Sequence, residues 1–186
     1  MSIEDMRYRT KTYIAADWDG DKDLVDKLYE WNNNRNLALS FVNVHEVTQC
    51  SDDTLNCNIK KSLRQRLNIT KTFVLIVGEK TASLRSGKCC CCNYYQSFLT
   101  IEPKCNKGYH IDNRSYVQYE CEMAVKDFDD GLLKNIVVIY NGMVIPDKTK
   151  CPEVIRRKGT HIGSDCYNDR GGLCWNYFEI MNAICK

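Results

Sequence analysis

Four short apolar runs recur along the chain, and each has the composition of a buried β-strand. The runs are rich in β-branched and aromatic residues, and three of them have almost no polar interruption. This composition is typical of strands in a parallel sheet that is covered on both faces. The second run alternates in part between apolar and polar residues, which indicates a place nearer the sheet edge. The four runs are residues 12–16, 37–44, 73–78 and 136–140.

Between these runs, apolar residues recur every three or four positions, which predicts helices. Leu24, Leu28 and Trp31, for example, fall on one face of a helix because they are three or four residues apart. Ser115 followed three positions later by Gln118 is a capping-box pattern, so the third helix is expected to begin there. The predicted helices cover residues 21–33, 54–68, 117–128 and, after a Gly-Gly break, 173–184.

The alternation of strands and helices predicts one α/β domain over residues 1–186, with a doubly wound parallel sheet of the flavodoxin-like type. The expected strand order is 2-1-3-4, with room for a fifth strand at an edge. Two segments do not fit the alternation. Residues 81–113 hold five cysteines and no clear period, and we interpret them as a cysteine-rich loop insertion. Residues 141–172 are rich in turn residues and are interpreted as loops with at most one short strand.

Charge and hydropathy narrow the class of protein. The chain has 186 residues and a net charge of +2, and this near balance disfavours a nucleic-acid-binding protein. No apolar run approaches the roughly 18 residues of a membrane span. Residues 1–11 lack the apolar region of a secretory signal. We therefore expect a cytoplasmic protein that binds neither membranes nor nucleic acid.

Twelve cysteines are the most unusual feature of the composition. Four of them are consecutive, at residues 89–92, and a regular set of disulfides is hard to build from such a run, so reduced thiols are favoured. Cys89, Cys92, Cys105 and His110 have the spacing of a zinc site. The alternative is a loop of free thiols. Because the register of the run is ambiguous, we assign no metal ligand.

The positions of the strand ends select candidate site residues. Ligands of open α/β sheets bind beyond the carboxyl ends of the strands, where the strand order reverses. This rule selects Asp17 and Trp18 after the first strand. It also selects Gly78 after the third strand and Asn141 after the fourth. The start of the third helix is expected on the same rim, so these residues are predicted to line a ligand pocket beside it.

Glu120 is the most informative residue of the third helix. It comes three residues after Val117 and four before Ala124, so it lies along the apolar stripe of the helix rather than opposite it. A carboxylate in that place lies at the rim of a cleft or is paired with another group. The alternative is a solvated glutamate at the edge of the stripe.

The sequence lacks the motifs that mark several classes of enzyme. Neither of the glycine patterns that bind phosphate follows a strand, which disfavours a dehydrogenase or a P-loop nucleotidase. No G-x-S-x-G pattern is present, which disfavours an α/β-hydrolase. The three histidines, His45, His110 and His161, belong to no catalytic motif, and the role of His161 stays open.

Two segments carry a family resemblance. Residues 13–19 (YIAADWD) resemble the opening strand and loop of Toll/interleukin-1 receptor (TIR)-like domains. Residues 115–124 (SYVQYECEMA) resemble the W-V-x-Y-E-I-x-x-A helix of the bacterial TIR-like proteins of Thoeris antiphage systems, the ThsB group. The third and fourth strands fit this family in spacing and composition. Tyr116 stands where the family has tryptophan, and the cysteine-rich insertion also departs from the family pattern.

The resemblance implies an enzyme that breaks the bond between nicotinamide and ribose in NAD⁺, with NAD⁺ as substrate and no tightly bound cofactor. It implies that Glu120 is the catalytic carboxylate and that Asn141 contributes. Trp18 or Tyr119 would stack on a ring of the substrate. The ADP-ribose-derived product would activate a separate effector protein once a phage-derived trigger is present. The product, the trigger and the oligomeric state, including a homo-oligomer, stay open.

The main alternative is a non-catalytic TIR-like module that assembles receptors or filaments. The place of Glu120 on the apolar edge of its helix favours the enzyme. A flavodoxin-like response regulator is a third hypothesis. It needs an acidic cluster and a late lysine at the strand ends, a pattern that Asp17, Asp19 and Lys148 match poorly.

Overall fold

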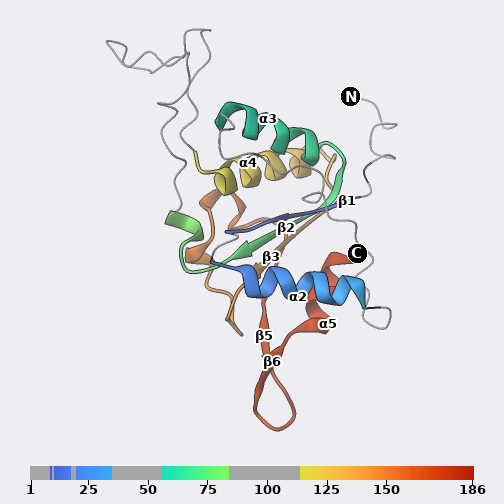
Figure 1. Ribbon diagram of the computed structural model, residues 1–186, viewed down its shortest axis with the longest axis vertical. Coiled ribbons are helices and arrows are strands. Elements are labelled where there is room, and N and C mark those ends of the chain that lie inside the picture. Colours follow the sequence, from blue (N-terminus) through green and yellow to red (C-terminus); the bar gives the residue numbers. More distant parts are fainter. Residues whose placement is uncertain (1–8, 10, 18–19, 35–55, 84–113) are drawn as a thin grey trace.

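The computed structural model describes residues 9, 11–17, 20–34, 56–83 and 114–186 of the chain (Figure 1). Trp18, the predicted strand at residues 37–44 and the four residues of the zinc hypothesis lie outside the described residues. No helix among the described residues is long and apolar enough to cross a membrane.

Four parallel strands form the central sheet, in the order β1-β2-β3-β4. Tyr13 of β1 is level with Phe73 of β2, which is level with Ile136 of β3. The sheet confirms the predicted flavodoxin-like α/β fold, and β4 is the additional strand expected at an edge. The strands are β1 (Lys11–Ala15), β2 (Thr70–Val77), β3 (Asn135–Tyr140) and β4 (Thr160–Gly163).

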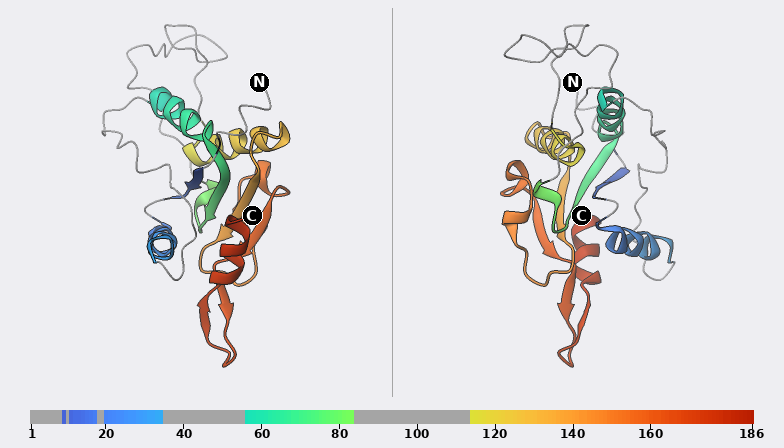
Figure 2. Two further views of the ribbon diagram at one scale, coloured as in Figure 1. Left: turned by 90° about the vertical axis from the view of Figure 1, so that its right-hand side faces the viewer. Right: turned by 60° about the vertical axis from the view of Figure 1, so that its left-hand side comes forward.

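Helices cover both faces of this sheet (Figures 1 and 2). Successive strand residues point to opposite faces, so Tyr13 packs in the cluster under α3 and α4 while Ile14 packs in the cluster under α2 and α5. Burial of both faces explains why β2 and β3 are apolar almost throughout. The helices are α2 (Lys22–Asn33), α3 (Asn56–Leu67), α4 (Tyr116–Asp129) and α5 (Tyr177–Ile184).

Helix α4 begins where the sequence predicts. The side-chain oxygen of Ser115 accepts a hydrogen bond from the backbone N–H of Gln118 at 3.0 Å. In a capping box the side chain of Gln118 would also bond to the backbone N–H of Ser115. Here the side-chain amide of Gln118 instead donates to Glu122 at 3.2 Å. One cap contact therefore fixes this helix end, which lies near Thr81 at the end of the β2 segment.

The C-terminal third differs most from the prediction. Residues 141–172, expected to be loops with at most one short strand, contain β4 and also the 3-10 turns η4 (Lys148–Lys150) and η5 (Glu153–Ile155). A hairpin follows, in which β5 (Asp165–Tyr167) pairs with β6 (Leu173–Trp175). The prediction of helix from residue 173 is wrong, because Leu173 belongs to β6 and the helix begins at Tyr177.

A buried ion cluster ties the two helices of one face together. Asp127 of α4 accepts hydrogen bonds from Arg9 at 2.9 Å and from Arg64 of α3 at 3.0 Å. The side chain of Asp127 is 2% exposed and that of Arg9 is 5% exposed. Arg9 also donates to the backbone carbonyl of Leu67 at 3.2 Å. Asp127 therefore joins α4 to the end of α3 and to the segment before β1.

Candidate functional site

The carboxyl ends of three strands surround a cavity of about 350 Å³. The end of β1, the start of α2, the turn after β2 and the end of β3 all contribute to it. The structure thus brings together three residues selected from the sequence, Asp17, Gly78 and Asn141. The cavity is lined by Asp17, Gly20, Asp21, Gly78, Glu79, Lys80 and Asn141.

Asp21 is the residue of this cavity that sequence reasoning missed. It is 1% exposed, and its Oδ1 accepts a hydrogen bond from Nδ2 of Asn141 at 3.1 Å. The same Asn141 nitrogen donates to Oδ1 of Asp23 at 3.0 Å. Burial raises the pKa of Asp21, while the Asn141 hydrogen bond acts in the opposite direction. Asn141 therefore holds two carboxylates at the start of α2 close to the end of β3.

The second oxygen of Asp21, Oδ2, is buried and has no hydrogen-bond partner among the described residues. A buried acceptor without a donor is costly unless a ligand or a water supplies one. The carboxylate also packs against Gly78, where an added Cβ would lie 2.2 Å from Asp21 Oδ1. The absence of a side chain at Gly78 therefore leaves room for the Asp21 carboxylate.

Glu120 lies in the apolar core between α4 and β1. It is 4% exposed, and its Oε1 accepts a hydrogen bond from the hydroxyl of Tyr13. Burial raises the pKa of Glu120 to about 7, although the Tyr13 hydroxyl and the charge of Arg66 both lower it. The solvated glutamate that the sequence left as an alternative is not the arrangement found. Glu120 does not belong to the lining of the cavity at the carboxyl edge.

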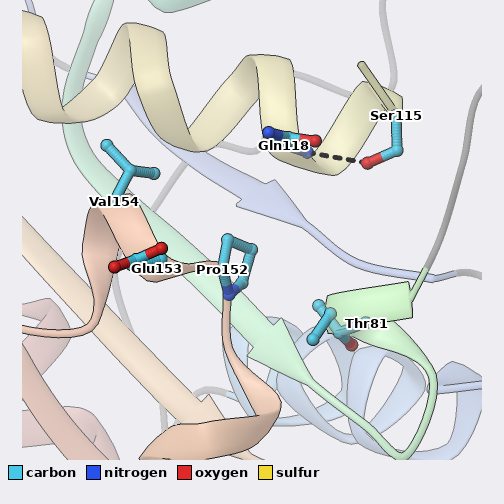
Figure 3. A pocket seen from close by; sticks show the side chains of 7 residues that line it. Thr81, Ser115, Gln118, Pro152, Glu153 and Val154 are labelled. Carbon is cyan, nitrogen blue, oxygen red and sulfur yellow. Dashed lines mark hydrogen bonds between the residues drawn. The ribbon is translucent and has the colours of Figure 1, made fainter. Parts of the chain in front are cut away.

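A second cavity, of about 470 Å³, opens at the start of α4 (Figure 3). Its walls come from the 3-10 turn η2 (Thr81–Ser83), the first turn of α4 and the η5 turn. Gln118, on the wall, is two residues from Glu120. The sequence offered no signal for this cavity, because three separate segments enclose it. The lining residues are Thr81, Ala82, Ser115, Gln118, Pro152, Glu153 and Val154.

One comparison with known families found a match to part of the chain. The sequence profile described as Thoeris protein ThsB, TIR-like domain, matches residues 13–86. This part of the chain is therefore similar to ThsB-type TIR-like domains. No curated protein matches the chain. The matched segment includes Asp17 and Gly78 at the carboxyl edge and ends before α4, so the assignment of Glu120 rests on the helix sequence and the contacts just described. The family that matches this segment is that of a Thoeris protein.

Tyr119 lies on the side of α4 that faces α3. Lys60 Nζ lies over its ring at 5.7 Å from the ring centroid, and the guanidinium carbon of Arg114 lies at 5.1 Å. Such contacts stabilise an aromatic ring in place. Among the described residues, Tyr119 lines neither of the two cavities described above.

His161 has a structural role between two strands of the sheet. Its Nδ1 is 2.8 Å from the hydroxyl of Tyr140, and its Nε2 is 3.1 Å from the backbone carbonyl of Lys158. The carbonyl is an acceptor, so Nε2 carries the proton and Nδ1 accepts from Tyr140. Burial lowers the pKa of His161, which favours this neutral form. The imidazole therefore joins β3 to β4.

Proposed function

We propose that this chain is a ThsB-type protein that cleaves the bond between nicotinamide and ribose in NAD⁺, and that Glu120 is the catalytic carboxylate. The observation that carries the proposal is a glutamate held in an apolar core by the Tyr13 hydroxyl, on the helix that matches the family motif. The ADP-ribose-derived product activates a separate effector protein. NAD⁺ is the substrate, and no other cofactor takes part.

The reaction suits a single buried carboxylate. The nicotinamide ring is cationic in NAD⁺ and neutral once the bond to ribose has broken, so its departure needs no general acid. The ribose develops oxocarbenium character in the transition state, as in glycoside hydrolysis, and a nearby carboxylate stabilises that charge. A pKa of about 7 leaves a large fraction of Glu120 ionised near neutral pH. An approaching positive charge increases that fraction.

The cavity at the carboxyl edge supplies groups that recognise a ribose. Asp17, Asp21 and Asn141 offer oxygen acceptors for sugar hydroxyls, and Asp21 Oδ2 has no donor among the described residues. The volume of about 350 Å³ is within the range of small-molecule sites. In this proposal Asp17, Gly78 and Asn141 contact the nucleotide, and Trp18 or Tyr119 stacks on one of its rings.

The test is incubation of the purified chain with NAD⁺, with mass spectrometry of the products. Glu120→Gln keeps the size of the side chain and removes its charge, so turnover should fall by roughly 10²–10³. Glu122→Gln is the matched control, because Glu122 lies on the same helix and pairs with Arg114. It should keep turnover within a few-fold of wild type. The assay is run in buffer and in lysate of phage-infected cells, where the trigger is present.

Equal turnover by wild type and Glu120→Gln would contradict the role of Glu120. If the wild type consumes no NAD⁺ in infected lysate, that result would contradict the enzymatic function as a whole. These two results are distinct, because the first leaves an active enzyme with another catalytic group.

A non-catalytic assembly module is the second candidate, and one observation favours it. Large apolar side chains are exposed near the C-terminus, namely Tyr167 (66% exposed), Leu173 (64%) and Phe178 (73%). Exposed apolar groups of this kind suit contact with another protein. Light scattering of the wild type and of a Tyr167→Ser, Phe178→Ser variant tests this candidate. A homo-oligomer that the variant loses would support it.

A further inference from the structure

The hairpin β5–β6 brings two cysteines face to face. Cys166 of β5 is directly opposite Cys174 of β6 in the antiparallel register. Their sulfur atoms are 3.4 Å apart. The hairpin projects away from the sheet and its helices (Figures 1 and 2). Two thiols are therefore in contact on a part of the molecule that lies outside the core.

The backbone geometry at this pair suits a disulfide. Asn168 N–H donates to the Gly172 carbonyl, and Asn176 N–H donates to the Ser164 carbonyl. Hydrogen-bonded pairs alternate with non-hydrogen-bonded pairs in an antiparallel ladder, so the cysteine pair midway between these two is also hydrogen-bonded. Such pairs have Cα atoms about 5.5 Å apart, within the range that disulfides span. The sulfurs, 3.4 Å apart, need to approach by only about 1.4 Å.

Both faces of the hairpin reach solvent. Cys174 is exposed and Cys166 is partly exposed. Tyr167 and Leu173, the next pair along the strands, project to the opposite face and are also exposed. A small reagent can therefore reach either sulfur. Cys121 and Cys151, in contrast, are buried in the core.

We propose that Cys166 and Cys174 are a site of reversible thiol oxidation, at which a low-molecular-weight disulfide such as glutathione disulfide converts the pair into a cross-strand disulfide. The site is separate from the cavities and from Glu120. Its chemistry does not depend on the proposed enzymatic function.

The reaction is a double exchange. The thiolate of Cys174 attacks one sulfur of the small disulfide, and the other half leaves as a thiolate. The thiolate of Cys166 then attacks the Cys174 sulfur of the mixed disulfide and displaces the second half. Two electrons pass from the protein sulfurs to the small disulfide, and the two protons lost by the cysteines end on the two small thiols. The neighbouring Cys174 thiol raises the pKa of Cys166, so Cys174, the more exposed thiol, is the first nucleophile.

The sequence offers a direct readout of this bond. Trypsin cleaves after Lys158 and after Arg170, and Arg170 lies in the turn between the two cysteines. Peptide 159–170 then contains Cys166, and peptide 171–186 contains Cys174 and Cys185. A disulfide between the strands holds these two peptides together. The other cysteines of the chain fall in different peptides and do not affect the measurement.

The experiment treats the reduced full-length protein with glutathione disulfide, blocks free thiols with N-ethylmaleimide in denaturant and digests without reductant. We expect peptides 159–170 and 171–186 as one species that carries one N-ethylmaleimide on Cys185. Its mass is the sum of the two peptides and that adduct, less two hydrogens, and its fragment ions join Cys166 to Cys174. Dithiothreitol should separate them. Cys185→Ser should leave the species in place, whereas Cys166→Ser and Cys174→Ser should each abolish it.

Three results would overturn the proposal. One is peptides that stay separate over a full redox titration. Another is a stable glutathione adduct on Cys174 that Cys166 does not displace. The third is a bond from Cys166 to Cys185, or to a cysteine elsewhere in the chain, in place of Cys174.

Discussion

The hydroxyl of Tyr13 on β1 donates a hydrogen bond to Oε1 of Glu120 on α4, across 107 positions of sequence. This contact forms only when the helix has packed on the sheet. It is also one of the two interactions that lower the pKa of Glu120 against the effect of burial. The ionisation of the proposed catalytic carboxylate is therefore coupled to a residue of the first strand.

Removal of this hydroxyl should shift the pH dependence of NAD⁺ turnover. Tyr13→Phe deletes the donor, so the pKa of Glu120 rises above its value of about 7. A shift of one unit would reduce the ionised fraction at neutral pH by about fivefold, with recovery as the pH rises. The measurement is turnover as a function of pH. Tyr140→Phe, which removes a hydroxyl from the His161 contact instead, should leave the profile unchanged. A Tyr13→Phe profile that overlays the wild type would contradict the coupling.

Glu120→Gln should change how stability depends on pH. Burial raises the pKa of Glu120 from 4.5 to about 7, so between these values the folded protein holds the proton more tightly than the unfolded chain does. The stability from this group is complete below pH 4.5 and is lost as the pH rises through 7. Glutamine does not ionise, so the variant should gain up to about 3 kcal/mol relative to wild type across this window.

Urea unfolding of both proteins at several pH values measures this difference. Glu122→Gln is again the control, since Glu122 pairs with Arg114 at the helix surface. A constant difference between Glu120→Gln and wild type at all pH values would show that Glu120 does not carry a raised pKa in the folded protein.

The parts of the fold that the sequence predicts are those with long, regular patterns. β2 is a run of eight residues, and α4 extends over fourteen, with a cap at Ser115. The burial of Glu120 follows from the same helical spacing. The gathering of Gly78 and Asn141 follows from parallel strands, whose carboxyl ends share one edge.

The parts that the sequence does not predict depend on short elements or distant partners. β5 and β6 have three residues each, too few to show a periodic pattern. Leu173 and Tyr177 are four residues apart, which is the spacing of apolar residues on one face of a helix. The role of Asp21 depends on Asn141, which is 120 positions away. Nothing within the local sequence of α2 distinguishes Asp21 from an ordinary residue at a helix start.

Asn141→Asp should destabilise the carboxyl edge at neutral pH. The asparagine nitrogen donates to both Asp21 and Asp23, and aspartate would replace this donor with a third negative charge. We expect a loss of about 1–3 kcal/mol that diminishes as the pH falls and the carboxylates protonate. Thermal melts at pH 5 and pH 8 measure it. Asn168→Asp is the control, because its Oδ1 still accepts from the backbone of the hairpin turn. Equal melting shifts at both pH values would contradict this electrostatic origin.

Asp127→Asn should cost more stability than the loss of any surface ion pair. Asp127 accepts hydrogen bonds from Arg9 and Arg64, and its side chain is 2% exposed, so its charge is largely shielded from water. Breaking a buried pair leaves an uncompensated charge and commonly costs about 3–5 kcal/mol. The control is Asp26→Asn in the exposed pair with Lys22, where both side chains are more than half exposed. That change should stay within about 0.5 kcal/mol of wild type. Chemical denaturation of the two variants measures the difference. Similar unfolding free energies for both would show that Asp127 does not hold α3 to α4, because removing its charge would then cost no more than removing a solvated one.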